Sequence, residues 1–182
     1  EQDDEYFLML YVLIVYAFNN QLRFNKKGEF NLPIGKRDFN SKMQEKLIGF
    51  IDRLKAGDYV FTSQSFAEVP IDDLTENSFV YADPPYLITN ASYNEQDGWT
   101  ETDEQKLLQF LDDLHSRGVK FALSNVIENK GKHNEILEAW VKERPMYRLI
   151  DLDYSYSNSN YHAGNKEKKT REVLVVNYRP LI

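Results

Sequence analysis

The chain has 182 residues, of which 42% are hydrophobic, and this suffices for one globular domain with its own core. It contains no cysteine, which excludes disulfides and thiolate metal sites and favours the cell interior. The formal net charge of -7 argues mildly against a polyanionic partner, so local clusters of Lys and Arg must carry any binding to nucleic acid.

The first expected element is a helix at residues 5–17, which is apolar nearly all round and therefore predicted to be buried. The apolar run at 6–18 is shorter than the roughly 20 residues that a bilayer-spanning helix needs. Acidic residues precede this run, where a signal peptide would be basic. We therefore expect an unexported, cytoplasmic protein that is nucleoid-associated if it acts on DNA.

A polar segment at residues 19–40 follows, and its pattern favours a hairpin. Two runs, 22–25 and 29–32, flank Lys26-Lys27-Gly28, a three-residue connection with glycine where a positive φ is wanted. A helical pattern returns at residues 41–54.

From residue 59 onward, short apolar runs alternate with helical patterns. The expected strands cover residues 59–62, 79–82, 119–124, 147–152 and 172–178. The expected helices cover residues 102–117, with Thr102 and Gln105 as a capping box and Gly118 as a stop, and residues 133–142. Such alternation indicates an α/β fold with a mostly parallel sheet.

The sharpest local motif is Asp83-Pro84-Pro85-Tyr86, directly after the expected strand 79–82. Ligands of α/β sheets bind at the carboxyl ends of strands. The two prolines fix φ at about -65° and bring no N–H donors, so the carbonyls here are rigidly held and free of ladder bonds. Taken alone, the tetrapeptide is also compatible with a stiff turn and no chemistry.

The motif suits reactions at a conjugated amino group, whose lone pair is delocalised and therefore poorly nucleophilic. The Asp83 carboxylate and the Pro84 carbonyl can accept the two amino hydrogens and localise the lone pair. Tyr86 offers a ring face to a base rotated out of a duplex. The same logic serves adenine, cytosine, and the amides of RNA or protein, although an aspartate at the first position favours adenine.

Three blocks in this chain resemble the Dam-type (D12 class) family of DNA adenine-N6 methyltransferases, especially bacterial and phage GATC methylases. The blocks are residues 18–25 with 28–35, residues 83–86 with Thr89, Ala91 and Tyr93, and residues 121–125. The resemblance implies a Rossmann-like S-adenosylmethionine-dependent methyltransferase fold with a helical and hairpin target-recognition segment. Residues 1–57 would form that DNA-binding region, and 58–182 the carboxy-terminal part of the catalytic domain. It implies methylation of adenine N6 in duplex DNA, with GATC as target and no metal.

The same resemblance implies DNA contacts. Phe18 would wedge into the base stack, and Arg23 would grip a guanine bidentately. The other implied or basic contact positions are Asn19, Gln21, Asn25, Pro33, Lys36, Arg37, Tyr93 and Asn94. Without DNA, Phe18 would simply end a buried helix and Arg23 would pair with Glu29 across the hairpin, while basic clusters are often ordinary solvated faces.

For the cofactor, the resemblance implies that Ser65 and Phe66 line the adenosyl pocket, with Asp83 beside them. An ordinary strand end explains Ser65 and Phe66 almost as well. Trp99 would belong to a flap over the flipped base or, equally, be an apolar anchor. Residues 154–158 and 166–171 resemble the family's last loop, where we expect phosphate contacts.

The chain also departs from the family. It has no G-x-G, whereas relatives carry an F-x-G-x-G loop for the amino-acid part of S-adenosylmethionine, and two central strands have no counterpart here. We therefore expect an incomplete, poorly stable sheet and hypothesise a truncated amino terminus or a companion chain. The alternative function is a catalytically inactive DNA-binding remnant of such an enzyme.

Overall fold

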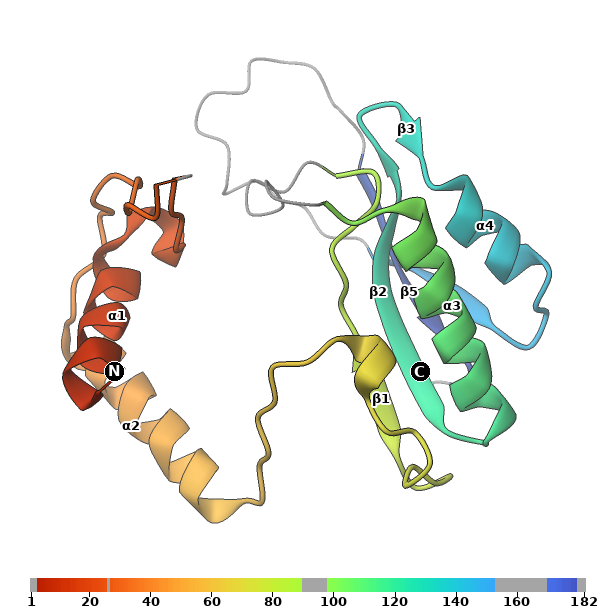
Figure 1. Ribbon diagram of the computed structural model, residues 1–182, viewed down its shortest axis with the longest axis horizontal. Coiled ribbons are helices and arrows are strands. Elements are labelled where there is room, and N and C mark those ends of the chain that lie inside the picture. The colour runs from red at the N-terminus through yellow and green to blue at the C-terminus, as the bar shows by residue number, and fades with distance from the viewer. Residues whose placement is uncertain (1–2, 26, 90–97, 153–169, 180–182) are drawn as a thin grey trace. The chain divides into compact units, whose positions relative to one another are not determined.

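The computed structural model describes residues 3–25, 27–89, 98–152 and 170–179. The chain divides into two compact units, Glu1–Ser63 and Gln64–Ile182, and each is described by itself (Figure 1). None of the described helices combines the length and the apolar character needed to cross a bilayer.

The described part of the first unit holds two α-helices, with the short 3-10 helix η1 (Phe18–Asn20) between them. Helix α1 (Asp4–Tyr16) begins at Asp3, whose carboxylate accepts the Tyr6 N–H at 2.9 Å. Helix α2 (Ser41–Ala56) begins in the same way at Asn40. The predicted helices are confirmed, but the predicted burial of the first is wrong. Within α1 only Val15 is buried, and Leu8 is 63% exposed, because the described part of this unit has no sheet to cover an apolar helix.

The hairpin between these helices is confirmed. Phe24 and Phe30 form an antiparallel pair, and the Asn25 N–H donates to the Glu29 carbonyl at 2.9 Å. Gly28 has the expected positive φ, 78°. The pairing is a single bridge rather than two extended strands, so the hairpin is short.

A second bridge, between Ala17 and Ile34, ties the base of the hairpin to the end of α1. The Gly35 N–H donates to the Tyr16 carbonyl at 2.7 Å. A Cβ at position 35 would lie 2.6 Å from the Ala17 carbonyl oxygen, so this close approach requires glycine.

The second unit is built on one sheet of mixed direction, with strand order β1-β2-β5-β4 and β3 paired to β2. The strands are β1 (Phe79–Ala82), β2 (Lys120–Asn129), β3 (Lys132–His133), β4 (Arg148–Leu152) and β5 (Thr170–Val176). The helices are α3 (Glu101–Ser116), α4 (Glu135–Lys142) and the short 3-10 helix η2 (Phe66–Glu68).

The predicted mostly parallel sheet is wrong for the described strands, because only β1 and β2 pair in parallel. Helices α3 and α4 act as the expected crossovers, so β1, β2 and β4 run in one direction. Strand β5 inserts between β2 and β4 and runs against both. The alternation of strands and helices before β5 is the same whether or not a later antiparallel strand inserts into the sheet, so the sequence pattern could not reveal this insertion.

The expected strand at residues 59–62 is also wrong. This segment has no regular secondary structure and pairs with no described segment, and Val60 is 89% exposed. An apolar run becomes a strand only where another strand satisfies its backbone. Strand β1 has the predicted bounds, whereas β2 continues five residues past the predicted end.

The core lies between the sheet and helices α3 and α4, which contact each other and pack against β2 (Figure 1). Its fully buried members from the helices are Leu111, Leu114 and Leu137, and those from the strands are Phe121, Leu123, Ile127, Val173 and Val175. Helix α3 therefore buries one apolar face, which includes Leu107, Leu108, Leu111 and Leu114.

Helix α3 begins one residue earlier than predicted, and its capping residue lies two residues earlier. The capping box is formed by Thr100 and Asp103 rather than by Thr102 and Gln105: the Thr100 hydroxyl oxygen accepts the Asp103 N–H at 3.2 Å, and the Asp103 carboxylate accepts the Thr100 N–H at 3.0 Å. The Thr100 hydroxyl also donates to the Asp103 carboxylate at 2.6 Å, and this bond, together with the one from the Thr100 N–H, lowers the pKa of Asp103. Gly118, at φ 77°, ends the helix as predicted.

This placement gives the first testable prediction. Thr100→Ala should lower the free energy of unfolding by about 1 kcal/mol, because the Asp103 N–H loses the hydroxyl oxygen that caps it. Thr102→Ala, an exposed change inside the first turn, should alter it by less than about 0.5 kcal/mol. Urea unfolding of both variants measures the difference, and a larger loss for Thr102→Ala would place the cap where the sequence pattern put it.

Candidate active site

The Asp83-Pro84-Pro85-Tyr86 turn leaves the sheet directly after β1. Ala82 pairs in parallel with Leu123, so Ser124 of β2 lies at the same carboxyl edge. The Tyr86 hydroxyl donates to Asp83 Oδ1 at 3.0 Å and lies 3.0 Å from the Ser124 hydroxyl. One phenol therefore joins the carboxylate of the turn to the neighbouring strand.

Burial raises the pKa of Tyr86 to about 12, while the hydrogen bond from Ser124 lowers it and the bond to Asp83 raises it. The phenol is therefore neutral at physiological pH and keeps its proton for Asp83. A tethered hydroxyl also fixes the direction of the ring.

We expect the Tyr86 phenol to titrate near pH 12, against 10.0 for a free tyrosine side chain. Because the unfolded phenol releases its proton earlier, stability should fall as the pH rises from about 10 to 12, and less so in Tyr86→Phe. The ring-carbon NMR signal that is missing from Tyr86→Phe identifies this phenol and reports its midpoint. A midpoint near 10 would contradict the burial of this phenol.

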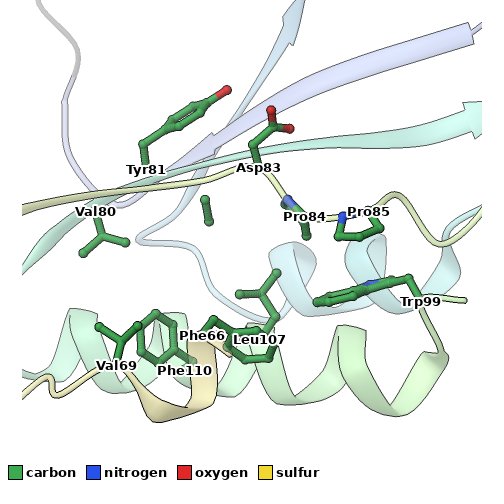
Figure 2. A pocket seen from close by; sticks show the side chains of 11 residues that line it. Phe66, Val69, Val80, Tyr81, Asp83, Pro84, Pro85, Trp99, Leu107 and Phe110 are labelled. Atoms are coloured by element: carbon green, nitrogen blue, oxygen red, sulfur yellow. The ribbon is translucent and has the colours of Figure 1, made fainter. Parts of the chain in front are cut away.

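A cavity of about 330 Å³ lies beside the turn, between β1 and the elements η2 and α3 (Figure 2). Its lining is mostly apolar and consists of Phe66, Val69, Val80, Tyr81, Ala82, Asp83, Pro84, Pro85, Trp99, Leu107 and Phe110. Figure 2 shows Val80 pointing toward Phe66 and Phe110, whereas Tyr81 and the Asp83 carboxylate point to the other side of the strand. Asp83 thus borders the apolar cavity, while its carboxylate is directed away from the aromatic rings.

Three aromatic rings form the wall of this cavity opposite β1. The Phe66 ring centroid lies 5.9 Å from that of Trp99 and 5.9 Å from that of Phe110. Ser65 does not line the cavity; its hydroxyl caps η2 by accepting the Ala67 N–H at 3.3 Å. The structure therefore brings Phe66 and Asp83 to one cavity, with Ser65 holding the turn that carries Phe66.

A buried carboxylate that sequence reasoning missed lies behind this wall. Glu104 of α3 is 0% exposed and accepts hydrogen bonds from Trp99 Nε1 at 2.6 Å, Asn125 Nδ2 at 3.0 Å and Asn134 Nδ2 at 3.0 Å. The sequence does indicate this burial, because residue 104 falls on the same helix face as Leu107, Leu108 and Leu111. A glutamate within such an apolar stripe needs partners.

In the first unit, Arg23 is oriented by Asn31. Its Nε donates to Asn31 Oδ1 at 2.9 Å and its Nη2 to the Asn31 carbonyl at 3.1 Å. The alternative pairing of Arg23 with Glu29 is wrong, because the Glu29 carboxylate accepts from the Asn25 amide at 2.9 Å.

The other DNA-contact candidates of this unit are mostly exposed. Phe18 is 46% exposed and does not end a buried helix, while its N–H donates to the Pro33 carbonyl at 3.1 Å. Arg37 donates to the Asn20 side chain at 2.7 Å. Asn19, Gln21 and Lys36 are exposed, and Asn25 is half-buried.

Several expected contacts lie outside the described residues, namely Tyr93, Asn94, residues 154–158 and residues 166–169. Arg171, at the start of β5, pairs with Asp151 at 2.6 Å. Across the described ranges, no three His, Asp or Glu side chains gather as a metal site.

Comparison with known proteins places this geometry in context. The family model of the D12 class N6 adenine-specific DNA methyltransferases matches residues 1–158. Modification methylase StsI of Streptococcus sanguinis is 43% identical over 177 residues, and type II methyltransferase M.FokI of Planomicrobium okeanokoites is 42% identical over 177 residues; each match covers 94% of this chain and 27% of the relative. DNA adenine methylase of Escherichia coli is 27% identical over 169 residues, covering 91% of this chain and 55% of that protein. The chain thus spans about a quarter of the first two relatives and about half of the third.

Proposed function

This chain belongs to the D12 class of N6 adenine-specific DNA methyltransferases, and from this premise we propose that it transfers a methyl group from S-adenosylmethionine to adenine N6 in duplex DNA. The observation that carries the proposal is the Asp83-Pro84-Pro85-Tyr86 turn at the carboxyl edge of the sheet, with an aromatic cavity beside it.

The cavity suits the adenine ring of S-adenosylmethionine. Small-molecule sites have volumes of about 300–1,000 Å³ and are lined mainly by apolar and aromatic side chains, as this one is. Phe66 and Trp99 offer ring surfaces to a flat heteroaromatic ring. When bound, S-adenosylmethionine supplies the electrophilic methyl group.

Asp83 and Pro84 are the proposed acceptors for the two hydrogens of the adenine amino group. Asp83 Oδ1 accepts from Tyr86, and none of the described side chains donates to Oδ2. One carboxylate oxygen thus holds the turn in place, and the other faces a substrate proton. Tyr86 is the proposed aromatic wall for the base, with its ring fixed through Ser124. Pro85 keeps the turn rigid.

Residues 1–57 are the proposed target-recognition region, with Arg23 as the base reader and Phe18 as the wedge. Asn31 occupies the Nε side of the Arg23 guanidinium, which leaves the outer N–H groups of Nη1 and Nη2 for guanine O6 and N7. Asn19, Gln21, Asn25, Pro33, Lys36 and Arg37 are the proposed neighbouring contacts in the same unit.

The DNA sequence that this protein recognises is the most specific element of the proposed function. GATC follows from the resemblance to Dam-type enzymes, yet the chain is more similar to two modification methylases than to DNA adenine methylase. This similarity also favours a role in a restriction–modification system. A test must therefore not presuppose GATC.

The deciding experiment incubates the full-length protein with S-adenosylmethionine and unmethylated genomic DNA. Mass spectrometry of the nucleosides identifies the modified base, and single-molecule sequencing maps it. N6-methyladenine confined to one sequence supports the proposed adenine methylation. Confinement to GATC also supports GATC as the target sequence. Methylated cytosine would contradict the proposal. Salt-dependent DNA binding without saturable S-adenosylmethionine binding would favour the inactive remnant instead.

A further inference from the structure

The carboxylate of Glu104 joins three parts of the second unit. Trp99 is a wall of the cavity, Asn125 directly follows Ser124 on β2, and Asn134 caps α4 by accepting the Leu137 N–H at 3.0 Å. Each donates one side-chain N–H to Glu104. Glu104 itself is too deeply buried to touch a ligand, because none of its surface is exposed.

We infer that Glu104 is a positioning residue that holds the Trp99 ring against Phe66 and thereby sets the affinity of the cavity for its ligand. The identity of that ligand, the methyl donor, rests on the proposed function. The shortest of the three bonds is the one to Trp99, at 2.6 Å. Trp99 precedes the cap residue Thr100, so α3 and Glu104 together fix both the backbone and the ring of this wall.

The chemistry of the contact requires an acceptor on both oxygens. Trp99 Nε1 donates to Oε2, while Asn125 and Asn134 donate to Oε1. Indole and amide N–H groups cannot accept in return. Glu104→Gln keeps the size of the side chain but turns an N–H₂ group toward one of these donors. An amide oxygen in the place of Oε1 keeps both asparagine bonds, so the N–H₂ group faces Trp99 Nε1, where one bond is lost and two donors are brought face to face.

The same carboxylate also relates the cavity to the turn. Asn125 and Ser124 are consecutive on β2, and the Ser124 hydroxyl meets that of Tyr86. A substitution at Glu104 can therefore affect the site in two ways. It can move Trp99 and alter the cavity, or it can move β2 and alter the position of Tyr86. The readouts must separate them.

The test uses the full-length protein labelled with 5-fluorotryptophan, in which the ¹⁹F resonance missing from Trp99→Phe belongs to Trp99. Without cofactor, Glu104→Gln should shift or broaden that resonance. The Kd for S-adenosylmethionine, measured by calorimetry, should rise about tenfold, as expected for one lost bond to a charged group. The rate at saturating cofactor should change less than twofold, because Asp83 and Tyr86 keep their partners.

A double-mutant cycle assigns the route. If Glu104 acts through the indole N–H, Glu104→Gln should change the Kd less than twofold in the Trp99→Phe background. Asn134→Ala is the matched control, since it removes a donor from the same carboxylate but leaves the bond to Trp99; it should lower stability and leave the Kd unchanged. If Glu104→Gln does not fold, Glu104→Asp, which withdraws the carboxylate by one methylene, takes its place.

An unshifted Trp99 resonance, or an equal rise in Kd with and without the indole N–H, would overturn the inference. Failure of the parent protein to bind S-adenosylmethionine would overturn the proposed function instead. The Trp99 resonance, measured without cofactor, still decides the positioning role in that case. The two failures are therefore distinguishable.

Discussion

In single-turnover assays, Asp83→Asn should methylate adenine about 100- to 1,000-fold more slowly than the parent protein, the usual effect of removing one preorganised polar partner of a transition state. Asparagine keeps the size of the side chain, and its carbonyl can still accept from Tyr86. Its amide N–H₂ would occupy the place of Oδ2, where the amino group of the base needs an acceptor. The nitrogen lone pair then stays delocalised, and nucleophilic attack slows.

The matched control is Asp72→Asn, which makes the same change of charge at an exposed aspartate paired with Arg117 at 2.7 Å. This variant should methylate within about twofold of the parent, since a surface ion pair contributes little. Fluorescence anisotropy should show nearly unchanged DNA affinity for both variants. A rate for Asp83→Asn within threefold of the parent would remove Asp83 from the chemistry.

Arg23→Ala should weaken binding to the cognate duplex about 10- to 100-fold, because a bidentate contact with guanine is worth roughly 1–3 kcal/mol of discrimination. Affinity for unrelated duplexes should fall much less. Arg23→Lys should lose most of the same discrimination, since an ammonium group cannot reproduce the planar fork. Asn31→Ala should lose part of it, because the Arg23 guanidinium would no longer be held in one orientation.

The control for charge is Lys42→Ala, at an exposed position of α2 in the same unit. Loss of this cation should weaken cognate and unrelated duplexes alike, if it changes either, and leave their ratio intact. Competition binding at fixed salt measures that ratio. An equal loss on both duplexes for Arg23→Ala would make Arg23 a phosphate contact rather than a base reader.

The local features of the fold followed from the sequence where one physical signal dominated. Strand β1 has a short apolar run bounded by the Asp83 turn, and its limits were predicted without error. Gly28 and Gly118 adopt the positive φ that their positions in a turn and after a helix demanded. Each of these signals is contained within a few neighbouring residues.

The errors arose where two neighbouring residues suited the same role or where a distant partner decides the outcome. Thr100 and Thr102 both suit a helix start, and the carboxylate of Asp103 selects the first. Residues 59–62 have the composition of a strand but pair with no described segment. The site shows the same limit: the motif residues were recognisable from their order, whereas the bonds of Glu104 join positions up to 30 residues apart in the chain.

The place of β5 in the sheet bears on how this unit is made in the cell. Residues 170–176 fill the gap between β2 and β4, so neither strand has its full set of partners while β5 is still in the ribosome. During synthesis, β2 and β4 must leave the position between them unpaired until β5 has been made. Such non-local strand pairing is slow. The part of the sheet that carries Ser124 can therefore become ordered only after β5 has been synthesised. On a ribosome stalled before residue 170, the sheet should be incomplete and should bind chaperones.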